Sequence, residues 1–304
     1  MKPTLKPTVF FGSGPVAARS LQLLLEWHPV STVVTKHTPH HHKEKAPVET
    51  VALQHHLPIL YADSKKELDM LELPTVDYGI VIDYGVIISA QTINRFSLGI
   101  INSHFSLLPE WRGADPITYA LLGGQQKTGV SIMRIDEGLD TGTLLATSEV
   151  AIAQTDTNQS LTDKLISTSD TLLRTSLPAY AAGSLSVYEQ PRRIATYSQK
   201  LTKSSGVLMP ERTAAELARQ VRAFSGWPGS RICYKDLWFT ITKADQSDIS
   251  VPLGRLSIYN KSLYFGCASG SLRIHELQPA GKKLMSAAAF INGYAQKLSL
   301  KTIA

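Results

Sequence analysis

The clearest fold signal in the chain is residues 8–27, TVFFGSGPVAARSLQLLLEW, where a short apolar run meets a glycine-rich turn and then a helical pattern. Thr8 to Phe11 is predicted to form a strand, and Val16 to Trp27 an amphipathic helix. Between them, Gly-Ser-Gly-Pro is typical of a tight turn. A strand that leads directly into a helix is the building unit of an α/β protein.

The same unit recurs along the first half of the chain. Ser31 to Thr35 is predicted as a strand and Pro47 to His56 as a helix. Further strands are predicted at Leu57–Leu60, Tyr78–Asp83, Gly99–Asn102 and Gly129–Met133, and a long helix at Asn158–Tyr180. Strands separated by helices pair in parallel, so we expect a Rossmann-like, mostly parallel sheet. Ligands of such sheets bind at the carboxyl ends of the strands.

The second half has a different pattern. Tyr188 to Lys203 lacks periodicity and is interpreted as an extended linker, and Thr213 to Phe224 as one helix. Short β-rich runs with turn signals follow, which indicate a small β-barrel of OB-like type. They are Trp238–Lys243, Leu256–Tyr259, Leu263–Cys267 and Leu272–Leu277. We expect domains at 1–188 and 207–304, joined by a linker at 189–206.

The charges of the 304 residues are unevenly distributed. Residues 1–189 hold 14 Lys and Arg against 19 Asp and Glu, a net −5, whereas residues 190–304 hold 17 against 6, a net +11. An acidic half joined to a basic half favours a catalytic domain with a module that binds an anion such as nucleic acid. The alternative is an ordinary domain with an uneven surface.

Several protein classes are disfavoured. No stretch of 18 apolar residues predicts a membrane span. Met1 to Pro7 has neither a secretory nor a transit pattern, and Cys233 and Cys267 cannot frame a disulfide scaffold. No Cys and His spacing of a zinc site is present, so no metal is expected. We therefore expect a cytoplasmic protein without a membrane partner.

The turn Gly12-Ser13-Gly14-Pro15 invites comparison with a dinucleotide-binding loop. The acidic residue that such a loop needs near the end of the second strand is missing, because Val34 to His37 reads VTKH. A nicotinamide oxidoreductase is therefore disfavoured. A turn that faces some other anionic ligand fits better.

The densest polar segment is residues 101–117, INSHFSLLPEWRGADPI, which follows a predicted strand. Asn102 and His104 are two residues apart, so they face the same side if the strand continues. An amide beside an imidazole suits polarisation of a carbonyl and support of an oxyanion, although a lone histidine is often structural. Ser106 to Pro109 could bind a flat heteroaromatic ligand, and Arg112 could meet an acid or a phosphate.

A second segment, residues 136–142, reads DEGLDTG and is predicted to be a loop that presents carboxylates. Asp140 is the acid better placed for a catalytic role, since a carboxylate near an imidazole can orient it. The alternative is an aspartate that closes a turn.

The motif NSHFSLLPEWRG at 102–113, with LDTG at 139–142, resembles the folate-dependent formyltransferases. Among these, the chain most resembles the methionyl-tRNA formyltransferases along nearly its full length. The matching stretches include Thr196 to Leu201, Arg222 to Phe224 with Trp227-Pro228, and LQPAGKK at 277–283.

This resemblance implies transfer of a formyl group from 10-formyltetrahydrofolate, a co-substrate, to the α-amine of initiator methionyl-tRNA. It implies that Asn102, His104 and Asp140 are catalytic and that Ser106, Leu107, Leu108 and Pro109 bind tetrahydrofolate. The basic second half would lie along the tRNA, and a monomer is the simplest expectation. Our candidates for tRNA contact are Lys36, Lys43, Lys45, Arg192, Arg193, Lys282 and Lys283.

Three departures from the family pattern stand out. The loop at 36–46, KHTPHHHKEKA, is shorter than usual and rich in histidine, and His40 to His42 are expected to be solvated. Asp115 occupies a position where the family often has a small apolar residue, and Leu208-Met209 replaces an acidic–aromatic pair. None of these changes touches the predicted catalytic trio.

Other functions stay open at this point. A formyltransferase for a sugar-nucleotide amine would share the trio, and one for glycinamide ribonucleotide would need only a single domain. A catalytically silent RNA-binding protein on the same scaffold is a further alternative. A formyl-transfer assay separates these possibilities.

Overall fold

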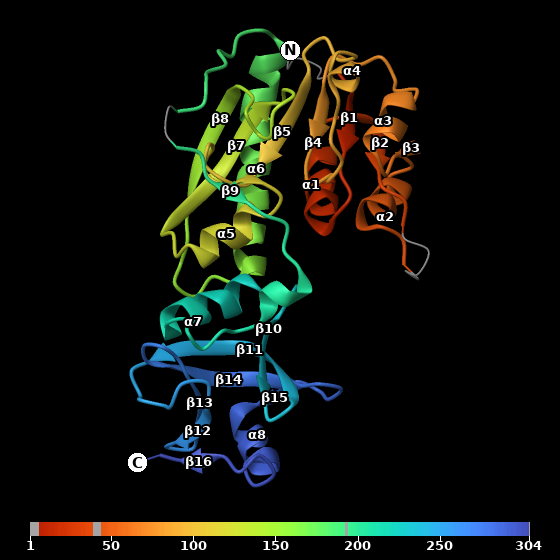
Figure 1. Cartoon of the computed structure of the whole chain (residues 1–304). Helices are drawn as coiled ribbons and strands as arrows, with labels where there is room; N and C mark the ends of the chain where they lie inside the picture. Colours follow the sequence, from red (N-terminus) through yellow and green to blue (C-terminus); the bar gives the residue numbers. More distant parts are fainter. Residues whose placement is uncertain (1–5, 39–43, 192–193, 304) are drawn as a thin grey trace. The chain divides into compact units, whose positions relative to one another are not determined.

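The computed structural model describes residues 6–38, 44–191 and 194–303 (Figure 1). The chain divides into two compact units. The first comprises Met1–Pro116, Lys127–Ala151 and Thr162–Gln199, and the second comprises Ile117–Gln126, Ile152–Leu161 and Lys200–Ala304. The domain boundaries given above stay predictions.

The first unit is built on a seven-stranded sheet that contains both parallel and antiparallel pairs. Its strand order is β3 (Ile59–Tyr61), β2 (Val30–Thr35), β1 (Thr8–Phe11), β4 (Gly79–Val81), β5 (Ile100–His104), β7 (Lys127–Arg134) and β8 (Leu144–Ala151). The pairs from β3 to β5 are parallel, whereas β5–β7 and β7–β8 are antiparallel. The mostly parallel sheet is thereby confirmed. β1 has the predicted bounds, and β8 was not predicted.

Helices cover this sheet because its central strands are apolar on both faces. Val9, Phe11, Ile80 and Ile100 are all fully buried. The helices of this unit are α1 (Pro15–Leu25), α2 (Pro47–Gln54), α3 (Lys65–Met70), α4 (Ala90–Ile93) and most of α6 (Asn158–Ala181). All but the first residue of α5 (Pro116–Leu122) belongs to the second unit. Figure 1 shows α6 running along β5, β7 and β8. The hydroxyls of Ser103 on β5 and Ser169 on α6 share a 2.6 Å hydrogen bond across that contact.

The second unit contains the predicted small β domain, formed by an antiparallel sheet. Its order is β10 (Ser230–Tyr234), β11 (Leu237–Ser247), β14 (Ser271–Pro279), β13 (Ser262–Gly266), β12 (Leu256–Tyr259) and β16 (Lys301–Thr302). β16 pairs in parallel with β12, and β15 (Met285–Ser286) pairs with β14. Helices α7 (Ala214–Ala223) and α8 (Ala287–Tyr294) pack on it, and Leu217, Phe239 and Phe290 lie in the shared core. A short 3₁₀ turn, η1 (Lys203–Gly206), precedes α7.

A small parallel ladder lies outside both sheets. β6 (Arg112–Gly113) pairs with β9 (Tyr197–Ser198), so a stretch that lacks any periodic signal is hydrogen-bonded to the segment after β5. This ladder joins residues that are about 85 positions apart in the chain. The ladder fixes the main chain of Arg112 and Gly113, which follow β5.

The described ranges contain neither a membrane-spanning helix nor a cluster of metal ligands. No helix there is long and apolar enough to cross a membrane. No group of three or more His, Cys, Asp and Glu side chains in those ranges has the geometry to hold a metal ion.

Candidate active site

The candidate site lies at the carboxyl end of β5, next to the antiparallel strand β7. Asn102 and His104 are both on β5 and pair with Met133 and Ser131 of β7. The strand does continue through His104, so the two side chains point to the same side. The His104 side chain is 6% exposed, so it is almost completely enclosed.

The ring of His104 is held between two oxygen acceptors. Its Nε2 lies 3.0 Å from the carbonyl oxygen of Trp111. Because a carbonyl oxygen can only accept, Nε2 carries a hydrogen. Its Nδ1 faces the Oδ2 of Asp140 at 3.7 Å, which is longer than a hydrogen bond. The two ring nitrogens of His104 therefore face oxygen atoms on opposite sides.

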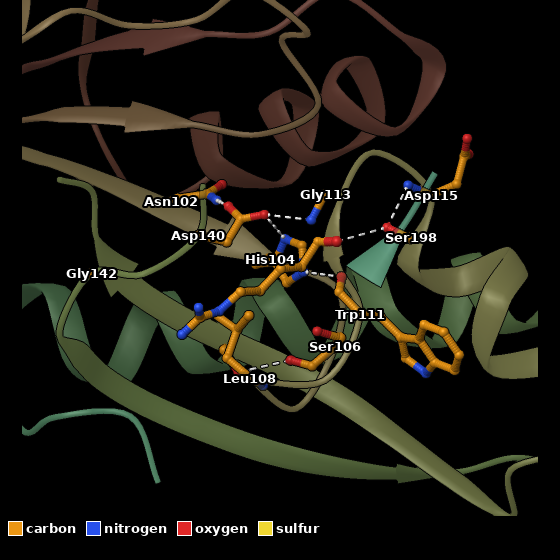
Figure 2. Close-up of polar contacts among 12 residues, drawn as sticks. Asn102, His104, Ser106, Leu108, Trp111, Gly113, Asp115, Asp140, Gly142 and Ser198 are labelled. Carbon is orange, nitrogen blue, oxygen red and sulfur yellow. Dashed lines mark hydrogen bonds and ion pairs between the residues drawn. The ribbon is translucent and has the colours of Figure 1, made fainter. Parts of the chain in front are cut away.

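Asp140 is the point where the three predicted catalytic residues meet. Its Oδ2 accepts a 2.8 Å hydrogen bond from the backbone N–H of Gly113, and its Oδ1 lies 3.5 Å from the amide nitrogen of Asn102. Figure 2 shows the three side chains pointing toward one another. The structure brings Asn102, His104 and Asp140 together, while their catalytic roles stay predictions.

The loop that carries Asp140 is shaped by its own residues. The Oδ1 of Asp136 accepts hydrogen bonds from the Gly138 N–H at 3.0 Å and the Thr141 hydroxyl at 2.6 Å. A Cβ on Gly142 would overlap the carbonyl oxygen of Arg134, so only glycine fits there. Asp140 itself has φ of 51°, in the left-handed region. Asp136 therefore closes the loop, and Asp140 is the acid that faces β5.

Sequence reasoning missed a set of contacts made by residues 188–191 and 194–198, which we call the crossing segment. Tyr188 pairs with Leu144 at the start of β8 through two backbone hydrogen bonds of 2.8 and 3.0 Å. The hydroxyl of Thr196 accepts from the Trp111 N–H at 2.9 Å, and the carbonyl oxygen of Thr196 accepts from the Arg112 N–H at 2.9 Å. The segment thus holds the residues that follow the catalytic strand.

Gln190 and Ser198 extend this hold through their side chains. The amide nitrogen of Gln190 donates to the carbonyl oxygens of Asp140 and Gly142 at 2.7 and 3.0 Å. Ser198 donates to the carbonyl oxygen of Arg112 at 3.2 Å. No period or charge pattern marks these positions. The family resemblance at Thr196 to Leu201 could have drawn attention to Ser198, but it does not include Gln190.

Arg112 has a partner that the sequence did not point to. Its guanidinium donates a 2.6 Å hydrogen bond to the side-chain oxygen of Gln190, 78 residues further along the chain. Arg112 therefore stands in the structure as a support of the site. The predicted contact of Arg112 with an acid or a phosphate stays a prediction.

The residues predicted to bind tetrahydrofolate are largely buried. Ser106 is 0% and Leu108 2% exposed. The hydroxyl of Ser131 donates to the carbonyl oxygen of Ser106 at 2.7 Å and accepts from the Leu108 N–H at 3.0 Å. Pro109 is buried and Leu107 half-buried. The structure thus shows Ser106 and Leu108 as supports beneath the site, and a folate contact along this run stays a prediction.

The glycine-rich turn after β1 faces an anion that belongs to the chain itself. The carboxylate of Asp83 accepts a hydrogen bond from the backbone N–H of Ala17 at the start of α1. A Cβ on Gly14 would overlap that carboxylate. Although Asp83 as a residue is exposed, burial of its carboxyl and then the charge of Asp115 raise its pKa to about 6. Asp83 fills the position at the helix N-terminus that a phosphate takes in a dinucleotide-binding loop.

The remaining predicted residues are dispersed. Lys36 is half-buried, and its positive charge lowers the pKa of Asp83, against the larger effect of burial. Lys45 forms an ion pair with Glu49 at 3.3 Å. Lys282 and Lys283 are exposed on the second unit. Lys43, Arg192, Arg193 and His40 to His42 lie outside the described residues.

Asp115, the acid that departs from the family pattern, is not part of the trio. Its backbone N–H donates to the Ser198 hydroxyl at 3.2 Å, and Figure 2 shows its side chain pointing away from His104 and Asp140. Its charge acts on Asp83 instead.

Comparison with known proteins places the chain in a family. A family model described as formyl transferase matches residues 20–177, and one described as its C-terminal domain matches residues 200–295. The methionyl-tRNA formyltransferase of Coxiella burnetii, strain CbuK_Q154, is 35% identical over 302 residues, covering 95% of this chain and 96% of the relative. That of Methylococcus capsulatus is 35% identical over 297 residues, covering 94% and 96%. The chain belongs to the methionyl-tRNA formyltransferase family.

Solved structures share the fold of this formyltransferase family member at low identity. HypX from Aquifex aeolicus matches with a TM-score of 0.68 and 14% identity, covering 98% of this chain and 49% of that one. An N-formyltransferase from Helicobacter canadensis, solved with folinic acid and dTDP-3-aminofucose, matches with a TM-score of 0.67 and 17% identity, covering 89% and 98%. At these identities the likeness concerns the fold alone.

Proposed function

We propose that this formyltransferase transfers the formyl group of 10-formyltetrahydrofolate to the α-amino group of methionyl-initiator-tRNA. The observation that carries the proposal is the 35% identity to methionyl-tRNA formyltransferases over 95% of the chain. The convergence of Asn102, His104 and Asp140 supports it, because the trio offers what an acyl transfer needs. The enzyme would act as a monomer in the cytoplasm.

In this proposal, Asn102 and His104 stabilise the oxyanion that forms when the amine attacks the formyl carbon. A side-chain amide has two N–H groups, so Asn102 can face Asp140 with one and the formyl oxygen with the other. The Nε2–H of His104 is engaged by the Trp111 carbonyl. The edge of His104 that can face the reacting carbonyl is therefore the Nδ1 edge, which lies 3.7 Å from the Oδ2 of Asp140.

Asp140 then handles the proton of the nucleophile. The neutral amine forms the new C–N bond, and the electron pair of the carbonyl moves to oxygen. The carboxylate of Asp140 takes the proton from the amine nitrogen and passes it to N10 of the folate as the old C–N bond breaks. The products are a formamide and tetrahydrofolate. An α-amine has a pKa of about 7.7–8.0, so a strong base is not needed.

Substrate positioning supplies much of the remaining rate enhancement. We place the folate along the run Ser106 to Pro109 that follows β5, as the family resemblance implies. Lys282 and Lys283 are assigned to tRNA phosphates, which fix the register of the RNA without reading its sequence.

Single-turnover transfer of labelled formyl from 10-formyltetrahydrofolate tests the proposal. Methionyl-initiator-tRNA, methionyl-elongator-tRNA and a UDP-amino sugar are offered in parallel, with His104→Ala as the inactive control. We expect transfer to the initiator alone and its loss in the variant. Transfer to the sugar would reassign the substrate, and transfer to none of the three would contradict the proposed function.

A further inference from the structure

We propose that Gln190 is a positioning residue that sets the orientation of Asp140 for formyl transfer. This inference rests on the proposed function. It starts from the fact that Gln190 belongs to neither of the two segments that carry the catalytic candidates. Its side chain nevertheless connects both of them.

The first connection is to the loop that carries Asp140. The amide nitrogen of Gln190 donates to the carbonyl oxygen of Asp140 at 2.7 Å and to that of Gly142 at 3.0 Å. Both hydrogens of the amide are thereby used on carbonyl oxygens two residues apart. Because Asp140 has φ of 51°, a conformation that non-glycine residues adopt at a cost, its backbone needs support from outside the loop.

The second connection is to the segment that follows β5. The side-chain oxygen of Gln190 accepts from the guanidinium of Arg112 at 2.6 Å. The next residue, Gly113, donates its N–H to the Oδ2 of Asp140 at 2.8 Å. The contacts therefore close a ring through Gln190, Arg112, Gly113 and Asp140.

This ring holds Asp140 at both ends. Gln190 fixes its main chain, and Gly113 fixes its carboxylate. With both fixed, the two carboxylate oxygens face Asn102 at 3.5 Å and His104 at 3.7 Å. These two distances are long, so neither contact is strong enough to orient Asp140 by itself. The orientation must come from the ring.

Glutamine suits this position because it is both donor and acceptor. Glutamate at position 190 would still accept from Arg112 but would place a carboxylate oxygen against two carbonyl oxygens. Alanine would remove all the contacts. The two substitutions therefore separate the donor side of the ring from its acceptor side.

The test is the kinetics of Gln190→Ala and Gln190→Glu with methionyl-initiator-tRNA, with Glu189→Ala as the matched control from the same exposed stretch. Misplacement of a catalytic group by about 1 Å costs about 100-fold, so we expect kcat to fall about 10- to 100-fold in both Gln190 variants. KM for the folate should change less than about 3-fold, and Glu189→Ala should match the wild type. Wild-type kcat in Gln190→Glu would overturn the inference.

A double-mutant cycle with Asp140→Ala separates positioning from a general structural role. If Gln190 acts through Asp140, Gln190→Ala adds no further loss in the Asp140→Ala background. Full additivity of the two losses would overturn the inference.

Hydrogen exchange at the Gly113 amide gives a readout that does not depend on activity. The amide is held by the Asp140 carboxylate, so its exchange should be faster in Gln190→Ala than in the wild type. Unchanged exchange would contradict the ring. An inactive wild type with faster exchange in the variant would reject the proposed function and leave the positioning of Asp140 in place.

Discussion

At the scale of single residues, Asp140 is the group on which the site depends. It contacts both other members of the trio, but its firm hydrogen bonds are to main-chain and crossing-segment partners. The carboxylate of Asp136, four residues earlier, instead accepts hydrogen bonds from within the loop and closes it. Two aspartates four residues apart therefore have separable roles.

Asp140→Asn should lower kcat by at least about 100-fold while leaving folate affinity nearly unchanged. The amide cannot take the proton of the amine, and proton transfer of this kind contributes about 10²- to 10⁴-fold. Single-turnover rates and equilibrium folate binding measure the two quantities. Glu137→Gln, an exposed acid of the same loop, is the matched control and should behave as wild type. An equal fall of kcat in Asp140→Asn and Glu137→Gln would show that the fall comes from the net charge of the loop and not from proton transfer by Asp140.

At the scale of elements, the functional side chains lie in the loops at the ends of strands and helices. The N-cap residue of α1 is Gly14, which has no side chain that could cap the helix. The carboxylate of Asp83, just after β4, accepts the hydrogen bond of the Ala17 N–H in its place. The Asp140 loop follows β7, and the crossing segment ties that loop to the end of β5.

The Asp83 carboxyl gives a pH-dependent stability. Its pKa of about 6 in the folded chain lies above the ordinary value of 3.8, so the folded state binds the proton more tightly. The free energy of unfolding should therefore fall as pH rises from about 4 to about 6. Asp83→Asn should be more stable than wild type at pH 7 by about 1 kcal/mol, because solvent at the exposed residue screens part of the charge.

Thermal unfolding of both forms from pH 4 to pH 8 measures this effect. The difference in Tm should shrink as pH falls from about 6 to about 4, because the folded wild-type carboxyl becomes protonated over that range while the unfolded carboxyl, with a pKa of 3.8, still loses part of its proton. A difference that stays constant over that range would show that the substitution acts through packing at α1 and not through charge.

Gly142→Ala should displace the Asp140 loop, because the added methyl group would overlap the Arg134 carbonyl oxygen. We expect a loss of about 1–3 kcal/mol in the free energy of unfolding and a clear fall in kcat. Gly293→Ala, where a Cβ meets nothing within 4 Å, is the control for the substitution itself. Denaturant unfolding and single-turnover kinetics would be compared, and a fully active Gly142→Ala would contradict the tight fit.

Local patterns predicted some elements well and others not at all. β1 and β12 have the predicted bounds because alternating or continuous apolar runs mark strands directly. α3, α4 and α5 were missed because they span 6, 4 and 7 residues, too few for a helical period. β9 was interpreted as linker because two residues paired across about 85 positions leave no local trace.

The difference between local patterns and contacts distant in the sequence also explains which site residues could be predicted. Asn102, His104 and Asp140 lie in dense polar motifs on a strand and in a glycine-flanked loop, so the sequence points to them. Gln190 sits in an aperiodic stretch, and its role depends on contacts about 50 and 78 residues away. Contacts of that range become visible only in the fold.

At the scale of the whole molecule, charge and chemistry lie on different parts of the chain. The trio is in the acidic half, whereas residues 190–304 carry a net +11. Lys282 and Lys283 are exposed on the second unit, consistent with the proposed contact to tRNA phosphates.

Lys282→Ala should reduce the slope of log K against log salt for tRNA binding by about 0.7–0.9. Lys127→Ala is the control, since Lys127 already pairs with Glu149 at 2.7 Å in the first unit. Binding would be titrated at several salt concentrations. An unchanged slope in Lys282→Ala would remove this lysine from the interface.

The crossing segment also bears on the order in which the enzyme becomes competent during synthesis. A nascent chain that ends before Tyr188 already contains Asn102, His104 and Asp140, together with every strand of the first sheet. It lacks Gln190, Thr196 and Ser198, which hold the loops around them. During synthesis, the strands of the first sheet are therefore complete before the residues that hold the catalytic loops have been added, so we expect the site to be ordered only after Ser198 has emerged.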